Sequence, residues 1–224
     1  MHSLSDTVFV FDLDDTLYSE RSYELSGITA AWYKLSELNP DISTTIPIEL
    51  LINKREQWVD LILQIETKGF TLSRDLLLEI YRSHFPSIEL YDDSCQLLAF
   101  LVENKAKLAM ITDGRSLSQR QKLKALNIEH LFKPIQISEE TGYPKPNSES
   151  YLAIETRYPN HQYIYIGDNP KKDFVTPNKL GWKTYGLKDR GNNVHPQVEK
   201  AREIIYRPQV WLYSHLELIP RIAL

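Results

Sequence analysis

Short apolar runs recur along the chain at intervals that suit the strands of a buried sheet. They lie at residues 8–11, 108–111, 135–137, 163–166 and 182–185, with a weaker sixth run at 210–212. Segments with helical periodicity separate most of these runs. Because alternating strands and helices are typical of a parallel sheet covered on both faces, the pattern predicts an α/β fold with a Rossmann-like, three-layer core.

Polar residues that favour helix starts precede several of the helical segments. The expected helices follow residues 92–94, run from Ser116 to Leu126 and from Asn147 to about Arg157, and end the chain over 216–222, where Pro220 weakens the pattern. Ser, Asp and Asn side chains accept hydrogen bonds from the unpaired backbone N–H groups of a helix's first turn. These candidate caps therefore support the alternation of strands and helices.

Residues 18–91 break the alternation, because they contain no convincing strand. Apolar residues recur there at helical spacing in three groups, which are Leu25 to Leu35 before Pro40, Leu51 to Ile65 before Gly69, and Leu76 to Ile80 after Ser73. A structureless connection of this length is uncommon in a compact domain. We therefore expect a helical domain over residues 18–91, inserted after the first strand, and an α/β core built from residues 1–17 and 92–224.

The charge balance excludes two classes of partner. The 224 residues include 26 Lys and Arg against 30 Asp and Glu, a net charge of −4, without a dense basic block. Since nucleic acids and anionic membranes attract clustered basic residues, we expect neither as a partner. The first residues lack a secretory signal pattern and no apolar stretch reaches the roughly 20 residues that span a bilayer, so we expect a cytoplasmic protein. The oligomeric state cannot be read from the sequence.

The chain contains one cysteine, Cys95. Alone, it can form neither an internal disulfide bond nor a thiolate zinc site. A lone cysteine most often packs as a small apolar side chain. We therefore expect Cys95 to be buried in the core.

Three acidic residues follow the first predicted strand, where Asp12, Asp14 and Asp15 lie within four positions. Loops at the carboxyl ends of parallel strands form the ligand crevice of such sheets, and crowded carboxylates repel unless a cation or a proton neutralises them. A helix cap would explain one of the three acids. A calcium loop is excluded, because its glycine and glutamate positions hold Leu17 and Tyr23.

A second acidic cluster follows the strand predicted at 163–166, where Gly167 and Asp168 are followed by Asp173. Alone, a Gly-Asp pair after a strand indicates only a turn. Together with the first cluster, it supplies the additional oxygen ligands that Mg²⁺ requires. The two clusters therefore predict a magnesium site at the carboxyl edge of the sheet.

Two further clusters supply groups that suit phosphate. Thr112 and Asp113 end the strand predicted at 108–111, and Ser116 begins the next helix, where a hydroxyl and backbone N–H groups can bind phosphate oxygens. Lys145 lies between two prolines, which limit its backbone freedom. Taken alone, the first of these clusters is better explained as a turn and helix cap, and Lys145 as a solvated surface lysine.

Taken in order, these clusters resemble the haloacid dehalogenase superfamily, and specifically its magnesium-dependent phosphatase branch. The family's four motifs match Asp12, Asp14 and Thr16 in the first, Thr112 in the second, Lys145 in the third, and Gly167, Asp168 and Asp173 in the fourth. The resemblance spans Val8 to Leu218 and leaves only the helical insert weakly matched. Two residues depart from the pattern: Asp113 stands where asparagine is common, and Pro177 interrupts the helix expected after the fourth motif.

The resemblance implies a role for each matching residue. Asp12 would be the nucleophile that forms an aspartyl-phosphate, and Asp14 would protonate the leaving oxygen and later activate water. Mg²⁺ would be held by the carboxylates of Asp12 and Asp168 and by the backbone carbonyl of Asp14. The insert lies where the family has a helical cap of the type that follows the first strand.

The remaining motif residues would act on the phosphoryl group. By resemblance, Thr112 would hydrogen-bond to it, with Asp113 beside it on the substrate side, and Lys145 would neutralise its charge. Asp173 would steady Lys145 or a metal-bound water.

The resulting hypothesis is a Mg²⁺-dependent hydrolase of a small phosphate monoester, such as a nucleotide or a sugar phosphate. The metal-free dehalogenases fit less well, because they do not need the acid at Asp14. A phosphomutase shares the same core but requires another acid or base in the cap, which the sequence does not identify. A catalytically silent binding module is the alternative from another class. It would have no reason to retain the whole set of Asp12, Asp14, Lys145 and Asp168.

Overall fold

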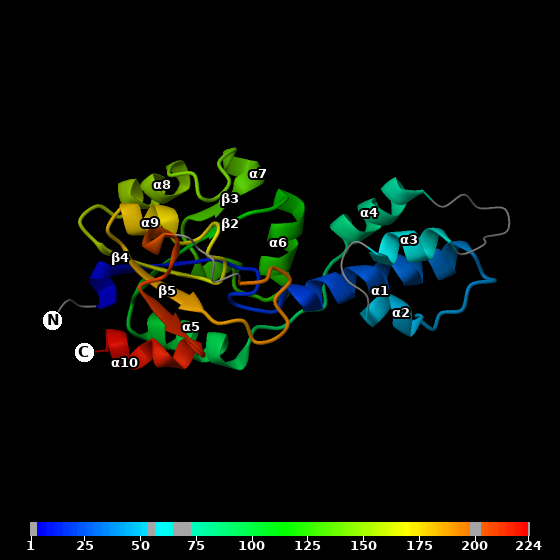
Figure 1. Ribbon diagram of the computed structural model, residues 1–224, viewed down its shortest axis with the longest axis horizontal. Helices are drawn as coiled ribbons and strands as arrows, with labels where there is room; N and C mark the ends of the chain where they lie inside the picture. Colours follow the sequence, from blue (N-terminus) through cyan, green and yellow to red (C-terminus); the bar gives the residue numbers. More distant parts are fainter. Residues whose placement is uncertain (1–3, 53–56, 65–72, 198–202, 224) are drawn as a thin grey trace. The chain divides into compact units, whose positions relative to one another are not determined.

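Six parallel strands form one sheet in the computed structural model, which describes residues 4–52, 57–64, 73–197 and 203–223 (Figure 1). The strands are β1 (Thr7–Phe11), β2 (Lys107–Thr112), β3 (Ile135–Ile137), β4 (Gln162–Gly167), β5 (Lys183–Leu187) and β6 (Val210–Leu212). Their order in the sheet is β3-β2-β1-β4-β5-β6, and every neighbouring pair is parallel. The expected α/β fold is therefore confirmed, including the weak sixth strand.

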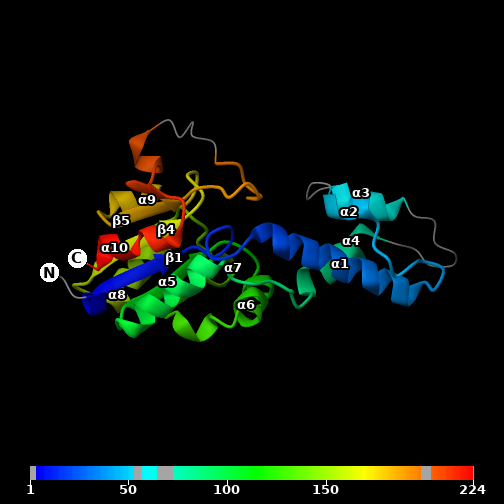
Figure 2. The same ribbon diagram turned by 90° about the horizontal axis from the view of Figure 1, so that it is seen from below.

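Helices cover both faces of the sheet. The core contains α5 (Asp92–Glu103), α6 (Ser116–Ala125), α7 (Ser138–Thr141), α8 (Glu149–Arg157), α9 (Val175–Lys179) and α10 (Ile219–Ile222), with short 3₁₀ turns at Leu4–Asp6, Glu129–Leu131, Ile204–Tyr206 and His215–Glu217. Figures 1 and 2 show α5 and α10 on one face and α8 and α9 on the other. The three layers match the sequence prediction.

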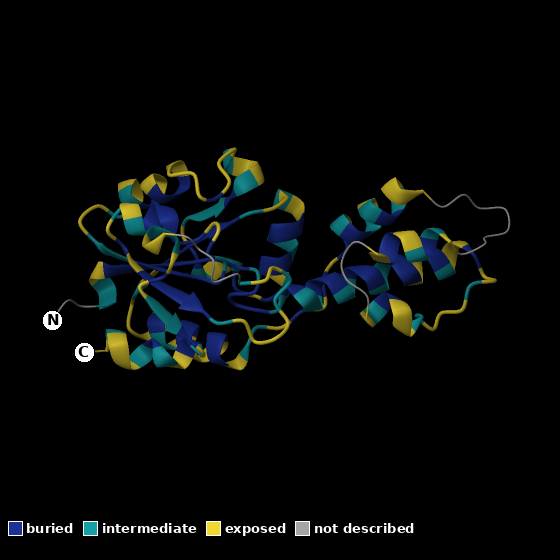
Figure 3. Ribbon diagram, in the orientation of Figure 1, coloured by how far each residue is buried: buried dark blue, intermediate teal, exposed yellow. Residues whose placement is uncertain are grey.

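The central strands are buried on both faces, as the dark ribbon of Figure 3 shows. All five residues of β1 are buried, because a central parallel strand has helices on either side. On the α8 side, Val8 and Val10 belong to one apolar cluster with Tyr151 and Ile154. This packing fixes the carboxyl ends of β1 and its neighbours, where the acidic clusters begin.

The helix starts differ from the expected caps. Ser116 is the first residue of α6 and does not cap it, because its hydroxyl donates to Glu140 (2.6 Å) and its backbone N–H donates to Glu139 (2.7 Å). These glutamates therefore take up the Ser116 hydroxyl and backbone N–H, two of the groups that we expected at the phosphate seat. Asn147 lies two residues before α8 and accepts a hydrogen bond from the Glu149 backbone N–H (3.3 Å). Ser73 caps α4 (Arg74–Ser83) as expected, by accepting from the backbone N–H of residue 76.

Two other sequence expectations need correction. Cys95 is exposed rather than buried, because the buried stripe of α5 runs through Ser94, Leu97 and Leu98 and leaves position 95 outside it. The fifth strand begins one residue later than expected, since the Trp182 backbone N–H donates to the Pro177 carbonyl at 2.9 Å and not to a neighbouring strand.

The prolines fit the helices that contain them. Pro220 lies in the first turn of α10 and Pro177 in the first turn of α9. A proline in the first turn costs little, because the N–H groups there have no acceptor within the helix. Pro177 therefore does not interrupt the helix that follows β4.

The chain separates into two compact units, formed by residues 21–88 and by residues 1–20 with 89–224. The helical unit carries α1 (Glu20–Leu38), α2 (Ile48–Ile52), α3 (Gln57–Leu63) and α4. Its interior includes the Trp58 and Tyr81 rings, stacked at a centroid distance of 5.3 Å. The second expected helical group falls on two helices, α2 and α3, and Ile65 and Gly69 lie outside the described residues. Within the described residues, every helix is too short or too polar to cross a lipid bilayer.

Candidate active site

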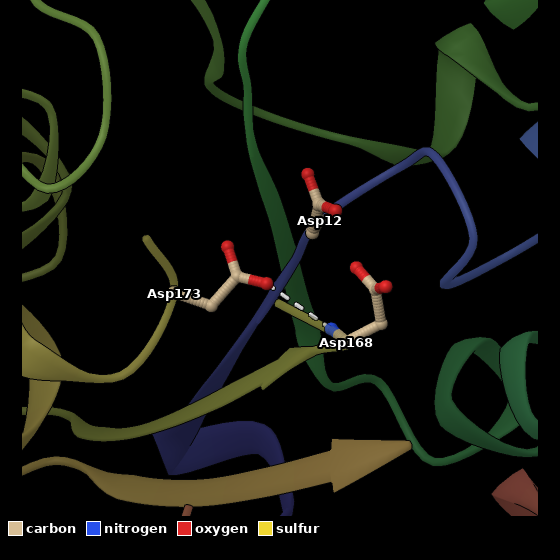
Figure 4. A group of neighbouring side chains, drawn as sticks. All are labelled: Asp12, Asp168 and Asp173. Atoms are coloured by element: carbon tan, nitrogen blue, oxygen red, sulfur yellow. Dashed lines mark hydrogen bonds between the residues drawn. The ribbon is translucent and has the colours of Figure 1, made fainter. Parts of the chain in front are cut away.

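The sheet brings Asp12 and Asp168 together. Phe11 at the end of β1 pairs with Ile166 of β4, and the Asp12 backbone N–H donates to the Ile166 carbonyl at 2.9 Å. The residues that follow these two strands therefore lie side by side at the carboxyl edge, where Figure 4 shows them with Asp173. One oxygen from each of the three carboxylates lies within 4.8 Å of the others.

Lys145 is the cation at the centre of this cluster. Its Nζ donates to Asp12 Oδ1 at 2.6 Å and to Asp173 Oδ1 at 2.7 Å, and its side chain is only 4% exposed. Asp12, Asp168 and Asp173 are buried as well. Because one ammonium group cannot balance three carboxylates, the cluster retains excess negative charge that a divalent cation would offset.

Protein donors already occupy both oxygens of Asp173. Oδ1 also accepts from the Tyr165 hydroxyl at 3.1 Å, and Oδ2 accepts from the backbone N–H groups of Asp168 (3.1 Å) and Asn169 (2.8 Å). Gly167 is required beside it, because a Cβ there would lie 2.5 Å from Asp173 Oδ2. Asp173 is therefore built in as a support, which leaves Asp12 and Asp168 as the better candidates for metal ligands.

Burial shifts the titration of this cluster. It raises the pKa of Asp12 to about 7, with repulsion from Asp173 added and attraction to Lys145 opposing it. Burial and the neighbouring carboxylates raise the pKa of Asp168 well above its usual value. Although burial disfavours the ammonium form of Lys145, the charges of Asp12 and Asp173 raise its pKa. Without a further cation, the cluster therefore holds protons more tightly than solvated carboxylates do.

Asp14 lies in a different electrostatic environment. Its Oδ1 accepts from Lys122 Nζ at 2.7 Å and from the Tyr18 hydroxyl, and its Oδ2 accepts from Gln119 Nε2 at 3.0 Å. Burial alone would raise the pKa of Asp14, but Lys122 and these hydrogen bonds outweigh it and lower the pKa. The side chain of Asp14 is thus held as a carboxylate, apart from the ion pair at Lys145.

Thr112 and Asp113 lie at the end of β2, beside the loop that carries Lys145. The Thr112 hydroxyl oxygen accepts from Gln119 Nε2 at 2.5 Å. Asp113 Oδ1 accepts from the Lys145 backbone N–H, and its Oδ2 pairs with Lys172 Nζ, both at 2.9 Å. Asp113 therefore fixes the position of the Lys145 backbone and carries a lysine of its own.

Several site residues were not predicted from the sequence. A cleft at the acidic cluster is lined by Asp12, Asp14, Asp15, Glu20, Asp113, Lys145, Asp168, Asn169, Lys172 and His195. Gln119 and Lys122, three residues apart on α6, turn a polar face inwards and are buried. The three-residue spacing, which puts both side chains on one face of the helix, was the only sequence signal for these residues. It was too weak to predict a buried lysine, because a lysine on a helix is ordinarily solvated.

A family model for haloacid dehalogenase-like hydrolases matches residues 7–176, about three quarters of the chain. The chain belongs to this family. The match begins at β1 and continues into α9, so it contains the carboxyl ends of β1, β2 and β4, where the site residues lie.

Relatives of this chain include proteins named as phosphatases. A glyceraldehyde 3-phosphate phosphatase of Methanocaldococcus jannaschii is 29% identical over 188 residues, which cover 78% of this chain and 82% of the relative. The enzyme of the same name from Methanopyrus kandleri is 32% identical over 106 residues, which cover 46% of each chain. A ribulose-1,5-bisphosphate 5-phosphatase of Halopiger xanaduensis is 23% identical, with 80% of this chain and 83% of the relative covered.

Solved structures of the family share the fold of this chain. The HAD-hydrolase YfnB from Bacillus subtilis, bound to magnesium, aligns with a TM-score of 0.65 and 19% identity, with 97% of this chain and 99% of that chain covered. A 2-haloacid dehalogenase from Pseudomonas syringae aligns with a TM-score of 0.62 and 16% identity, with 97% of each chain covered. At these identities the similarity establishes the fold alone.

The raised pKa of Asp12 makes a prediction about stability. Because the folded protein binds this proton more tightly than the unfolded chain, Asp12 contributes stability below its unfolded pKa near 4, and this contribution is lost as the pH rises through about 7. Without Mg²⁺, Asp12→Asn should therefore raise the Tm by several degrees at about pH 8 and by clearly less at about pH 5. Thermal unfolding of the metal-free protein at both pH values measures this difference.

The matched control is Asp92→Asn, which changes an exposed acid at the start of α5. We expect it to leave the Tm close to that of the unchanged protein at both pH values. An Asp12→Asn protein that is less stable than the unchanged protein at about pH 8 would contradict the assigned electrostatics.

Proposed function

We propose that the chain is a Mg²⁺-dependent phosphatase that hydrolyses a small phosphate monoester through an aspartyl-phosphate at Asp12. The observation that carries this proposal is the Asp12 carboxylate, buried beside Asp168 and paired with Lys145 at 2.6 Å. Membership of a hydrolase family and phosphatase relatives over most of the chain support the same reaction. Within this proposal, residues 18–91 are the cap and residues 1–17 and 92–224 are the core.

The donor set fits Mg²⁺. Carboxylate oxygens of Asp12 and Asp168 and the backbone carbonyl of Asp14 would hold the ion, and Mg²⁺ prefers such oxygen ligands. Its charge would offset the repulsion between the attacking carboxylate and the phosphate. Asp173 would remain a support, because protein donors occupy both of its oxygens.

In the proposed reaction, a carboxylate oxygen of Asp12 attacks phosphorus as the bond from phosphorus to the ester oxygen breaks. Asp14 gives its proton to that oxygen, so the product leaves as an alcohol. Water then attacks the aspartyl-phosphate and gives a proton back to Asp14, which releases phosphate and restores Asp12. Lys145 offsets the charge on the phosphoryl oxygens, and Thr112 donates a hydrogen bond to one of them.

Asp113 and Lys172 would set the charge at the outer side of the phosphate. A carboxylate at position 113, where the family often has asparagine, would repel the dianionic substrate. Lys172 Nζ lies 2.9 Å from Asp113 Oδ2 and also lines the cleft, so it offsets that charge. We therefore propose that the two residues act as a compensating pair.

The substrate that fits best is a small sugar phosphate. Three relatives are named glyceraldehyde 3-phosphate phosphatases and a fourth is named a ribulose-1,5-bisphosphate 5-phosphatase, so the relatives act on short phosphorylated sugars. Nucleotide phosphates are the alternative within the same reaction class.

The reaction is tested by release of p-nitrophenol from p-nitrophenyl phosphate, with Mg²⁺ and after chelation. We expect release to require Mg²⁺ and to fall by at least about a thousandfold in Asp12→Asn, because the nucleophile is lost. Asp92→Asn should retain the full rate. Hydrolysis that persists at the same rate after chelation, or in Asp12→Asn, would refute the mechanism.

The charge pair is tested by a double-mutant cycle. Lys172→Met should raise KM by about tenfold with little change in kcat, because it leaves Asp113 uncompensated near the substrate phosphate. Adding Asp113→Asn to Lys172→Met should bring KM most of the way back to the value of the unchanged protein. If the double variant binds as weakly as Lys172→Met, Lys172 does not act by offsetting Asp113.

The substrate class is tested by a phosphate-release screen with sugar phosphates and nucleotides at equal concentration. We expect kcat/KM to be highest for glyceraldehyde 3-phosphate or another short sugar phosphate, and at least about tenfold lower for nucleoside monophosphates. Asp12→Asn protein, assayed in parallel, corrects for contaminating phosphatases. Preference for a nucleotide would reject the substrate class and leave the reaction class intact.

A further inference from the structure

The segment that follows β5 reaches back to two acidic residues of the site. Asn193 Nδ2 donates to Asp168 Oδ2 at 2.9 Å, and the Val194 backbone N–H donates to Asp15 Oδ2 at 2.8 Å. Both acids belong to the loops that follow β1 and β4. We call residues 189–197 the β5 clasp.

The clasp is held in shape by its own hydrogen bonds. Asp189 Oδ1 accepts from the backbone N–H groups of Gly191 (2.7 Å) and Asn193 (3.1 Å), and Gly191 has a φ of +92° that favours glycine. At the other end, Gln197 Oε1 accepts from the Asp189 backbone N–H at 2.9 Å, and Gln197 Nε2 donates to the Asp168 carbonyl at 2.8 Å. The turn that presents Asn193 is therefore defined by side chains on both sides of it.

The clasp is also anchored to the start of α5. Arg190 Nη2 donates to both carboxylate oxygens of Asp93, at 3.0 and 2.7 Å, and the guanidinium lies 4.0 Å from the centre of the Tyr91 ring. Asp93 in turn accepts from the Ser214 hydroxyl (2.7 Å) and the His215 backbone N–H (2.9 Å). Because Asp93 is fixed by several donors, it gives Arg190 a rigid point of attachment.

The contact with Asn193 matters because of the position of Asp168. This carboxylate is buried, and the like charges of Asp12 and Asp173 lie close by. An amide N–H that donates to one oxygen stabilises the ionised form and fixes the plane of the group. The direction of the second oxygen, which remains for a metal ion, is then set by the clasp.

We propose that Asn193 is a positioning residue that orients Asp168 for binding the divalent cation, and that the pair Arg190–Asp93 holds it in place. This inference rests on the metal site of the proposed function. It adds to the site a residue from a loop that lies outside the four motifs. Outer-shell partners of this kind typically change metal affinity by about 10- to 100-fold when they are removed.

The test is a calorimetric titration of the metal-free full-length protein with MgCl₂. Asn193→Ala should weaken Mg²⁺ binding by at least about tenfold, whereas Asn192→Ala, at the exposed neighbouring position, should leave it unchanged. In p-nitrophenyl phosphate hydrolysis, the same variant should need more Mg²⁺ for half-maximal rate but approach the normal kcat at saturating Mg²⁺. Arg190→Lys, which loses the guanidinium group that contacts Asp93 and the Tyr91 ring, should weaken Mg²⁺ binding less than Asn193→Ala does.

The outcomes separate this inference from the proposed function. If the unchanged protein binds Mg²⁺ and Asn193→Ala binds it equally well, the role of Asn193 is refuted while the metal site stands. If the unchanged protein binds no Mg²⁺, both proposals fall. Thermal unfolding of each variant checks the fold, and an Arg190→Lys protein with unchanged Tm and unchanged Mg²⁺ affinity would refute the anchoring role of Arg190.

Discussion

The candidate site depends on one electrostatic constraint, the crowding of buried carboxylates around a single buried lysine. Asp12 and Asp173 share Lys145, and Asp168 lies within reach of both but forms no ion pair with a lysine in the part of the chain that the structure describes. Such an arrangement is unfavourable unless protons or a cation supply the missing positive charge. Burial, together with repulsion from Asp173, raises the pKa of Asp12. In the proposed metal site, a divalent ion would supply the missing positive charge.

The folded protein tolerates the repulsion between these carboxylates because the backbone around the cluster is firmly packed. β1 is buried along its whole length and pairs with β4 over five positions, so Asp12 and Asp168 cannot move apart without breaking the centre of the sheet. Asp173 packs against Gly167 with no room for a Cβ and accepts two backbone N–H groups. On a mobile loop, their repulsion would separate these carboxylates. Here the packed core keeps them close together.

The sequence was most informative where chemistry and local pattern coincide. Asp12, Asp168 and Lys145 could be predicted because acids at the ends of apolar strands, and a lysine between prolines, match a known order of motifs. The strands themselves were recognisable because buried parallel strands are apolar without interruption.

The residues that escaped prediction act over long sequence distances. Gln119 contacts Asp14 from 105 positions away, and Asn193 contacts Asp168 from 25 positions away in a segment that reads as an ordinary turn. No local pattern encodes such contacts. Ser116 and Cys95 were misjudged for a related reason, since their roles depend on which face of the helix meets a neighbour.

The two acids of the first motif, Asp12 and Asp14, each contact a different buried lysine, and their pKa values shift in opposite directions. Lys145 shares its charge between two acids and leaves Asp12 with a raised pKa, whereas Lys122 serves Asp14 together with Gln119 and lowers its pKa. In this arrangement Asp14 is suited to accept a proton from water. To donate one to a leaving oxygen, it must first separate from Lys122, because a protonated carboxyl group gains nothing from that ion pair. The acid and base halves of the proposed cycle therefore call for two positions of one side chain, and the contact with Lys122 defines the base position.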